Sequence, residues 1–142
     1  MRKVMFSLTT LCFFISASTL VGQPCNVETL NGSYAGTVAG HNTSDVPVAY
    51  QAIAHFDGAG SFSLSGFTFV MNGVVLVDNA SASGGTYTVN RDCSGSLQIT
   101  SNGQTFKFAI LLTGRDFSQF QMLETDGSAT TTGNAVKQHR DR

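Results

Sequence analysis

Few side chains in this sequence are of the kinds that catalyse reactions or bind metals, and those few are far apart. The chain has three histidines, His41, His55 and His139, and no two of them stand two or four positions apart with a carboxylate beside them. Such spacing places two ligands of one zinc ion on the same face of a strand or helix. We therefore expect solvated or structurally paired histidines, and the sequence predicts no metal and no cofactor.

The acidic side chains point to turns and not to an active site. Asp57, Asp116 and Asp126 fall in short segments that contain glycine, where an Asp side chain commonly accepts hydrogen bonds from the local backbone. A calcium site would need several oxygens that converge from one loop. Asp45 and a neighbouring serine near His41 are too few for a nucleophilic triad. No set of catalytic residues is indicated, which favours a protein that is not an enzyme.

The elements that carry these side chains are strands, and the stretch 56–92 shows this most clearly. Apolar residues recur there at every second position, and each run stops at a turn sequence. Asn72-Gly73 stands between two apolar runs, which is the strongest short-range signal for a β-hairpin. The stretch therefore predicts an antiparallel all-β domain.

Eight or nine strands follow from this pattern along the whole chain. We expect them at 32–39, 48–56, 62–71, 74–77, 86–89, 97–99, 105–113, 117–125 and 128–136. All connections but 40–47 are short, which favours an up-and-down meander that closes into a single antiparallel β-barrel; a β-sandwich is the alternative. In the stretch 105–113, we expect Phe106, Phe108, Ile110 and Leu112 to face the interior and Lys107 to face water.

The strand at 62–71 contains a change of phase. Phe62 and Leu64 are apolar at even positions, whereas Phe67 and Phe69 are apolar at odd positions. A one-residue slip would turn the second pair outward, so we expect a β-bulge at or beside Gly66 that keeps all four side chains on one face. The segment 74–77 is apolar on both faces, which predicts a strand that is well covered.

The first 22 residues have the layout of a secretory signal peptide. A positive start, Arg2 and Lys3, precedes an apolar run that is too short to span a bilayer, and small residues follow. We expect cleavage between 17 and 23, a barrel domain over 23–137 and a polar tail at 138–142. The mature protein would be secreted or periplasmic and would have no membrane span.

Removal of this segment leaves a mildly acidic protein. The chain has 8 Lys and Arg against 9 Asp and Glu, and the loss of Arg2 and Lys3 leaves six basic residues against nine acidic ones. That balance gives no electrostatic reason to expect a nucleic acid as partner.

Two cysteines remain in the mature chain, because Cys12 lies in the signal segment. A bridge between Cys25 and Cys93 is therefore the only intramolecular disulfide that can form, and an oxidising compartment favours it. With nine strands, however, Cys25 and Cys93 would lie at opposite ends of the barrel. We keep the disulfide and expect the count of nine to be the error.

Several segments resemble a family of small exported bacterial proteins whose β-barrel domains are uncharacterised. The resemblance rests on LNGSYAGT, FDGAGSF, GTYTVNRDCSGSLQI and ETDGSATTTGNAVKQ, and it extends from Cys25 to Gln138. It implies a barrel similar to those of allene oxide cyclases and dirigent proteins, or to calycins. No catalytic residues carry over from it.

Two functions of different classes are compatible with such a barrel. The first is a binding or structural module that takes a small apolar ligand at its mouth or a partner on its outer face. The second is a cyclase or isomerase of the allene oxide cyclase type, which acts on an apolar substrate inside the barrel. Candidate pocket residues are Tyr34, Tyr50, Phe67, Phe69, Tyr87 and Met122, and candidate rim residues are His41 and Asp45.

Overall fold

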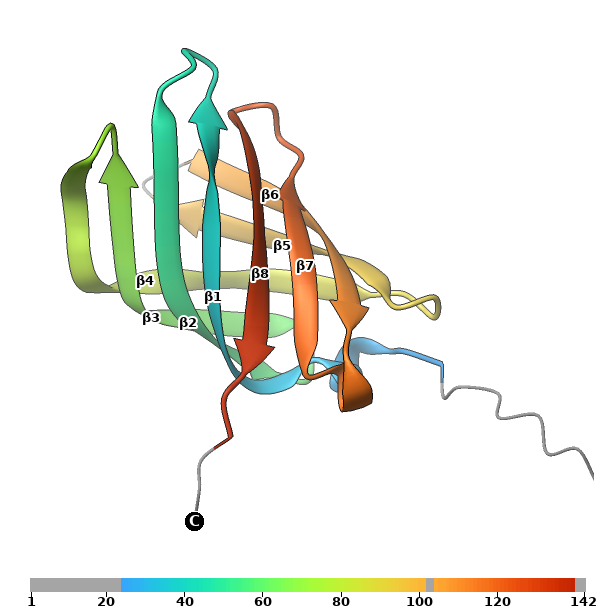
Figure 1. The fold of residues 1–142 in the computed structure, drawn as a ribbon. Helices are drawn as coiled ribbons and strands as arrows, with labels where there is room; N and C mark the ends of the chain where they lie inside the picture. The colour runs from blue at the N-terminus through green and yellow to red at the C-terminus, as the bar shows by residue number, and fades with distance from the viewer. Residues whose placement is uncertain (1–23, 102–103, 140–142) are drawn as a thin grey trace, which may run out of the picture.

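A computed structural model describes residues 24–101 and 104–139, and they form a closed barrel of eight strands (Figure 1). The strands are β1 (Asn31–Asn42), β2 (Pro47–Asp57), β3 (Ser61–Met71), β4 (Val74–Val89), β5 (Ser94–Ser101), β6 (Gln104–Thr113), β7 (Gln119–Glu124) and β8 (Ala129–Lys137). Two 3₁₀ turns, η1 (Val27–Thr29) and η2 (Arg115–Phe117), precede β1 and β7. Each strand pairs antiparallel with the next, and β8 pairs with β1. The predicted up-and-down barrel is confirmed and the sandwich alternative is wrong.

The count of eight comes from one long strand, β4, where the sequence indicated two. The segments 74–77 and 86–89 are the two ends of this strand. The glycines between them do not break the strand but allow close approach to a neighbour: a Cβ at Gly84 would lie 1.7 Å from the Phe62 carbonyl oxygen. Glycine in a strand often marks such an approach.

With eight strands instead of nine, the two cysteines lie at the same end of the barrel, where a disulfide can join them. We call the end at which β1 begins the lower end and the opposite end the upper end. Cys25, just before η1, and Cys93, in the turn between β4 and β5, both lie at the lower end, and the structure joins them in a disulfide. Disulfides are typical of proteins that fold outside the cytosol, so the bridge indicates a non-cytoplasmic location.

The bulge in β3 is confirmed. Gln51 pairs with Thr68 while Ile53 pairs with Ser65, so two residues of β3 lie opposite the single residue Ala52 of β2. Gly66 has a φ of +61°, a left-handed conformation that glycine adopts without steric cost. The extra residue restores the phase: Phe62 and Phe67 line the same interior cavity.

The expected coverage of residues 74–77 is wrong. Val74, Val75 and Leu76 are 58%, 56% and 50% exposed. The reason is the length of the neighbouring strand: β5 pairs with β4 only between Gly85 and Val89, and β5 ends before it reaches the first half of β4. In Figure 1 this half of β4 stands with the end of β3 as a hairpin at one side of the barrel.

The interior is a core of aromatic and aliphatic side chains. Phe108, Ile110 and Leu112 of β6 are each less than 7% exposed, and Lys107 is exposed, as the alternation predicts. Phe56 contacts Phe62, Tyr87 and Phe120 with ring centroids between 5.1 and 5.8 Å apart. Such edge and tilted contacts stabilise a core beyond the burial of area alone.

We predict that Phe108→Ala lowers the free energy of unfolding by about 3–5 kcal/mol, because the ring is 3% exposed inside this core. The measurement is a urea unfolding curve beside that of the unaltered protein. Leu111→Ala, on the outer face of the same strand, is the control and should cost less than about 1 kcal/mol. A loss below about 1 kcal/mol for Phe108→Ala would show that its ring borders open space.

We also predict that loss of the disulfide destabilises the fold. Cys25 and Cys93 are 68 positions apart, and the chain-entropy model gives about 4 kcal/mol for a loop of this size. The double variant Cys25→Ser/Cys93→Ser should therefore unfold at a clearly lower urea concentration. An unchanged midpoint would mean that the bridge does not restrict the unfolded chain.

Candidate functional site

The six candidate pocket residues all lie inside the barrel, but they divide between its two ends. Tyr34 and Tyr87 lie near the lower end, where Tyr34 donates to the Phe117 carbonyl oxygen (3.2 Å) and Tyr87 donates to the Leu30 carbonyl oxygen (2.8 Å). Leu30 itself has no exposed surface. These contacts tie the segment around η1 across the lower end, so this end is closed.

The other candidates lie higher, and they are packed together. Tyr50 lies 6.3 Å from both Phe69 and Phe108, measured between ring centroids. Met122 and Phe67 border the interior cavity, whose volume is about 70 Å³. Pockets that bind drug-sized molecules measure about 300–1,000 Å³, so the interior in this structure is filled mainly by its own side chains.

A buried carboxylate near the upper end was not predicted from the sequence. Glu124, the last residue of β7, is 8% exposed. Its Oε2 accepts from Thr131 (2.6 Å) and from the Tyr50 hydroxyl (3.2 Å), and its Oε1 accepts from Ser128 (2.6 Å). These three hydroxyl donors replace the hydrogen bonds to water that the carboxylate loses when it is buried. The sequence does contain a signal for this inward position, because Glu124 continues the every-second-residue pattern of Phe120 and Met122.

The two rim candidates lie at this upper end, but the structure does not bring them to the carboxylate. His41 is exposed near the end of β1, and Asp45 is exposed in the turn that follows, with a φ of +59°. His55 lies elsewhere, on the outer face, where Ser33 and Ser65 each lie 2.8 Å from one of its ring nitrogens. Among the described residues, no group of three His, Cys, Asp or Glu could hold a metal ion.

Two of the three turn carboxylates, Asp57 and Asp126, have the local role that the sequence predicts: Asp57 accepts from the backbone N–H of Ala59 and of Ser61, and Asp126 accepts from that of Ser128. The bond from Ser61 is the main cause of a lowered pKa of Asp57. Asp92, which was not singled out from the sequence, accepts from the Ser94 hydroxyl and backbone N–H, and these bonds lower its pKa. These carboxylates stabilise hairpin turns.

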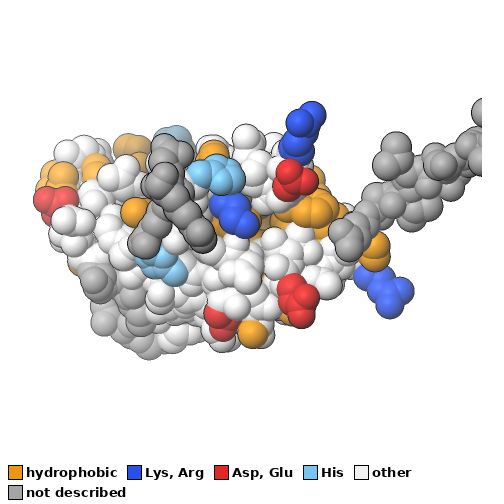
Figure 2. Space-filling view, turned by 90° about the horizontal axis from the view of Figure 1, so that it is seen from below, with side chains coloured by type: hydrophobic (Ala, Val, Ile, Leu, Met, Phe, Trp, Pro, Cys, Tyr) orange, Lys and Arg blue, Asp and Glu red, His pale blue; other side chains and the backbone are white. Residues whose placement is uncertain are grey.

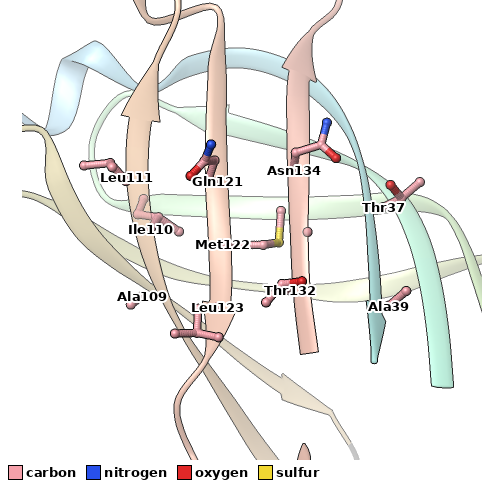
Figure 3. Close-up of a pocket in the computed structure, with 11 residues that line it drawn as sticks. Thr37, Ala39, Ala109, Ile110, Leu111, Gln121, Met122, Leu123, Thr132 and Asn134 are labelled. Atoms are coloured by element: carbon pink, nitrogen blue, oxygen red, sulfur yellow. The ribbon is translucent and has the colours of Figure 1, made fainter. Parts of the chain in front are cut away.

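A large hollow lies on the outside of the barrel. It has a volume of about 720 Å³, and we call it the outer hollow (Figure 3). Its lining comes from β1, β6, β7 and β8: Thr37, Ala39, Ala109, Ile110, Leu111, Gln121, Met122, Leu123, Thr132, Gly133 and Asn134. No ionisable side chain lines it.

Strand register arranges the outward side chains of this hollow in two rows. In the first row Leu111 lies opposite Gln121, then Asn134, then Thr37. The second row, in the same strand order, is Ala109, Leu123, Thr132 and Ala39. Figure 3 shows the leucines on β6 and β7, and the amides and hydroxyls spread over β7, β8 and β1. Each row therefore joins one exposed leucine to uncharged polar or small side chains.

The first row continues onto a second hollow. Thr37 pairs with Gln51 of β2, and these two residues, with Asn134, also line a hollow of about 450 Å³ over β1 and β2. A ladder of amide and hydroxyl groups thus runs from Gln121 to Gln51 across four neighbouring strands. Sequence reasoning missed it, because adjacent positions of the ladder are far apart in the chain.

Charge is sparse on the part of the surface that Figure 2 shows. Seen from the lower end, a few acidic and basic side chains are scattered among uncharged ones, with no broad area of one sign. In the described part of the chain, no helix is long and apolar enough to cross a membrane.

Comparison with known proteins does not assign the chain to a family. No protein-family model matches the chain, and no curated protein sequence matches it. A solved structure with a similar fold is the S-type phycobiliprotein lyase from Guillardia theta, with a TM-score of 0.47 and 10% sequence identity over 81% of this chain and 92% of that one. The resemblance to small exported bacterial proteins stays a prediction, whereas the closed antiparallel β-barrel is confirmed.

We predict that all three tyrosines ionise at unusually high pH in the folded protein. Burial raises the pKa of Tyr34, Tyr50 and Tyr87 above the ordinary value of 10.0. Each folded pKa exceeds the unfolded one, so this contribution to stability is complete below pH 10 and falls as pH rises further. An ultraviolet tyrosinate titration should therefore show less ionisation at pH 10 in buffer than in denaturant, where about half is expected. Half-ionised tyrosines in both would contradict the burial of these hydroxyls.

Proposed function

We propose that this protein is an exported binding module that holds an uncharged amphipathic small molecule against the outer face of its barrel. The main support for this proposal is the difference in volume between the hollow outside the barrel and the cavity inside it. About 720 Å³ lies outside, over β1, β6, β7 and β8, against about 70 Å³ inside. The first volume is in the range of small-molecule sites and the second is far below it.

The chemistry of the outer hollow defines the ligand class. Leu111 and Leu123 are each 46% exposed, and they offer apolar surface that a ligand would remove from water. Gln121, Asn134 and Thr37 offer donors and acceptors in a row. A molecule with a hydroxyl-rich part and an aliphatic part satisfies both, and a charged group would find no partner among the lining residues.

An enzyme of the allene oxide cyclase type is less well supported. Such an enzyme would hold its substrate among apolar side chains inside the barrel, and the interior cavity is too small for one. The buried Glu124 is fully engaged with Tyr50, Thr131 and Ser128. We assign that cluster to the stability of the upper end.

Export is the second part of the proposal. Residues 1–22 have the pattern of a signal peptide, and the Cys25–Cys93 bridge suits an oxidising compartment. The mature module would work in the periplasm or outside the cell. Its mildly acidic balance gives no reason to expect a nucleic acid as partner.

We predict that octyl glucoside, supplied as monomers below its micelle concentration, binds the outer hollow. In a saturation-transfer NMR experiment, both its alkyl chain and its sugar should receive magnetisation. Leu123→Glu should weaken binding by about tenfold or more, because a charge replaces apolar contact worth roughly 1.5 kcal/mol or more.

The matched control is Val136→Glu. Val136 is also exposed on β8, at 39%, but it lies outside the hollow, so binding should be unchanged. Equal losses in the two variants would contradict a specific site. A second measurement is solvent extraction of natively purified protein. If it yields one lipid molecule per protein, and the Leu123→Glu variant keeps this lipid, the ligand lies inside the barrel instead.

A further inference from the structure

The first half of β4 forms an open edge of the sheet. β4 pairs with β5 only from Gly85 to Val89, where Gly85 lies opposite Ile99. In the same register the end of β5, Ser101, lies opposite residue 83. Residues 74–80 therefore run past the end of β5 and pair with β3 alone, and Figure 1 shows them at the free side of the β3–β4 hairpin.

This edge is apolar on both faces. Val74 and Val75 are consecutive, so their side chains point to opposite faces of the hairpin, and Val74, Val75 and Leu76 are each at least half exposed. Apolar side chains on both faces of an open edge are unusual, because an unpaired row of backbone N–H and C=O groups is a template for another strand.

Most of the usual protections of an edge are missing here. Natural edge strands are commonly blocked by lysine, proline, an inward charge or a β-bulge, and residues 69–77 contain no lysine, proline or charge. The first charge is Asp78, and the irregularity that follows, Asn79 with a φ of +46°, lies beyond the exposed segment. Within 74–77, a register shift against β3 between Val75 and Val77 leaves Leu76 without a counterpart on β3, but no charge or proline accompanies it.

We propose that a second copy of this chain pairs antiparallel along this edge, so that two barrels share one continuous sheet about a two-fold axis. An antiparallel pair of identical strands is self-complementary, because the same patch serves both subunits. With the axis at Leu76, each Leu76 lies opposite its counterpart in the second copy, Asp78 lies opposite Val74, and no like charges meet. The exposed valines and leucines of the two copies then cover one another.

A lipid surface fits this edge less well. No lysine or arginine lies in 69–80, and the nearest charge, Asp78, is negative, whereas surfaces that bind anionic membranes are basic. A membrane would also leave the backbone groups of the edge without partners, but a second strand would satisfy them. The dimer does not use the outer hollow, so it is independent of the proposed binding function.

The test is the mass of the mature, disulfide-bonded protein in solution, measured by light scattering through a concentration series. The unaltered protein should approach twice the mass of one chain, and Leu76→Lys should remain a monomer because two lysines then meet at the axis. Val136→Lys adds the same charge on the exposed face of β8 and should dimerise normally. Equal far-ultraviolet circular dichroism of all three proteins confirms that each is folded.

Mixed variants test the two-fold pairing itself. Leu76→Lys and Leu76→Glu should each be monomeric alone, and their mixture should form a dimer because opposite charges then face each other across the axis. A wild type that stays monomeric throughout, or a Leu76→Lys variant that dimerises like the wild type, would overturn the proposal. So would monomeric protein that binds phosphatidylcholine vesicles through Leu76, since the edge would then meet lipid.

Discussion

The structure depends on the seam at which β1 and β8 meet and close the barrel. The two strands pair from Tyr34 to Asn42, and glycines lie where their backbones approach most closely. A Cβ at Gly40 would lie 2.0 Å from the Thr130 carbonyl oxygen, and one at Gly133 would lie 2.2 Å from that of Thr37. Larger residues at either position would force the strands apart. Without this seam, the sheet would have two open edges and an exposed core.

Closure also decides where binding can occur. A small eight-stranded barrel has an interior just wide enough to be filled by its own side chains or to hold one small ligand. Here Tyr34, Phe56 and Phe120 fill it below, and Tyr50 and Phe108 fill it above. The seam brings the outward residues of β1 and β8 together, so it creates the ladder of Thr37 and Asn134. The same closure that fills the inside builds the site outside.

Much of the fold could be predicted from the sequence because the evidence is local. Alternation on β6 predicts which residues face inward, and the phase change around Gly66 predicts the bulge. The long β4 could not be predicted, because Gly84 resembles a turn residue until its neighbouring strands are known. The exposure of Val74 and Leu76 depends on where β5 ends, which the composition of β4 does not reveal.

The candidate site was harder to predict, for a related reason. The six candidate pocket residues lie inside the barrel, but alternation alone does not report how much space remains between them. Glu124 continues the inward pattern of β7, yet a charge at an inward position argues against burial until its three hydroxyl partners are known. The polar ladder joins residues as distant as Gln51 and Asn134, and only the register of the closed barrel brings them together.

The central claim is that the interior is packed and that ligands bind outside. Leucine methyl groups report on both regions, since Leu97 and Leu112 are buried in the core and Leu111 and Leu123 line the outer hollow. The most direct measurement is a methyl NMR spectrum during titration with an uncharged alkyl glycoside. We expect the signals of Leu111 and Leu123 to shift while those of Leu97 and Leu112 stay in place. Shifts confined to Leu97 and Leu112 would contradict the account and place the ligand inside the barrel.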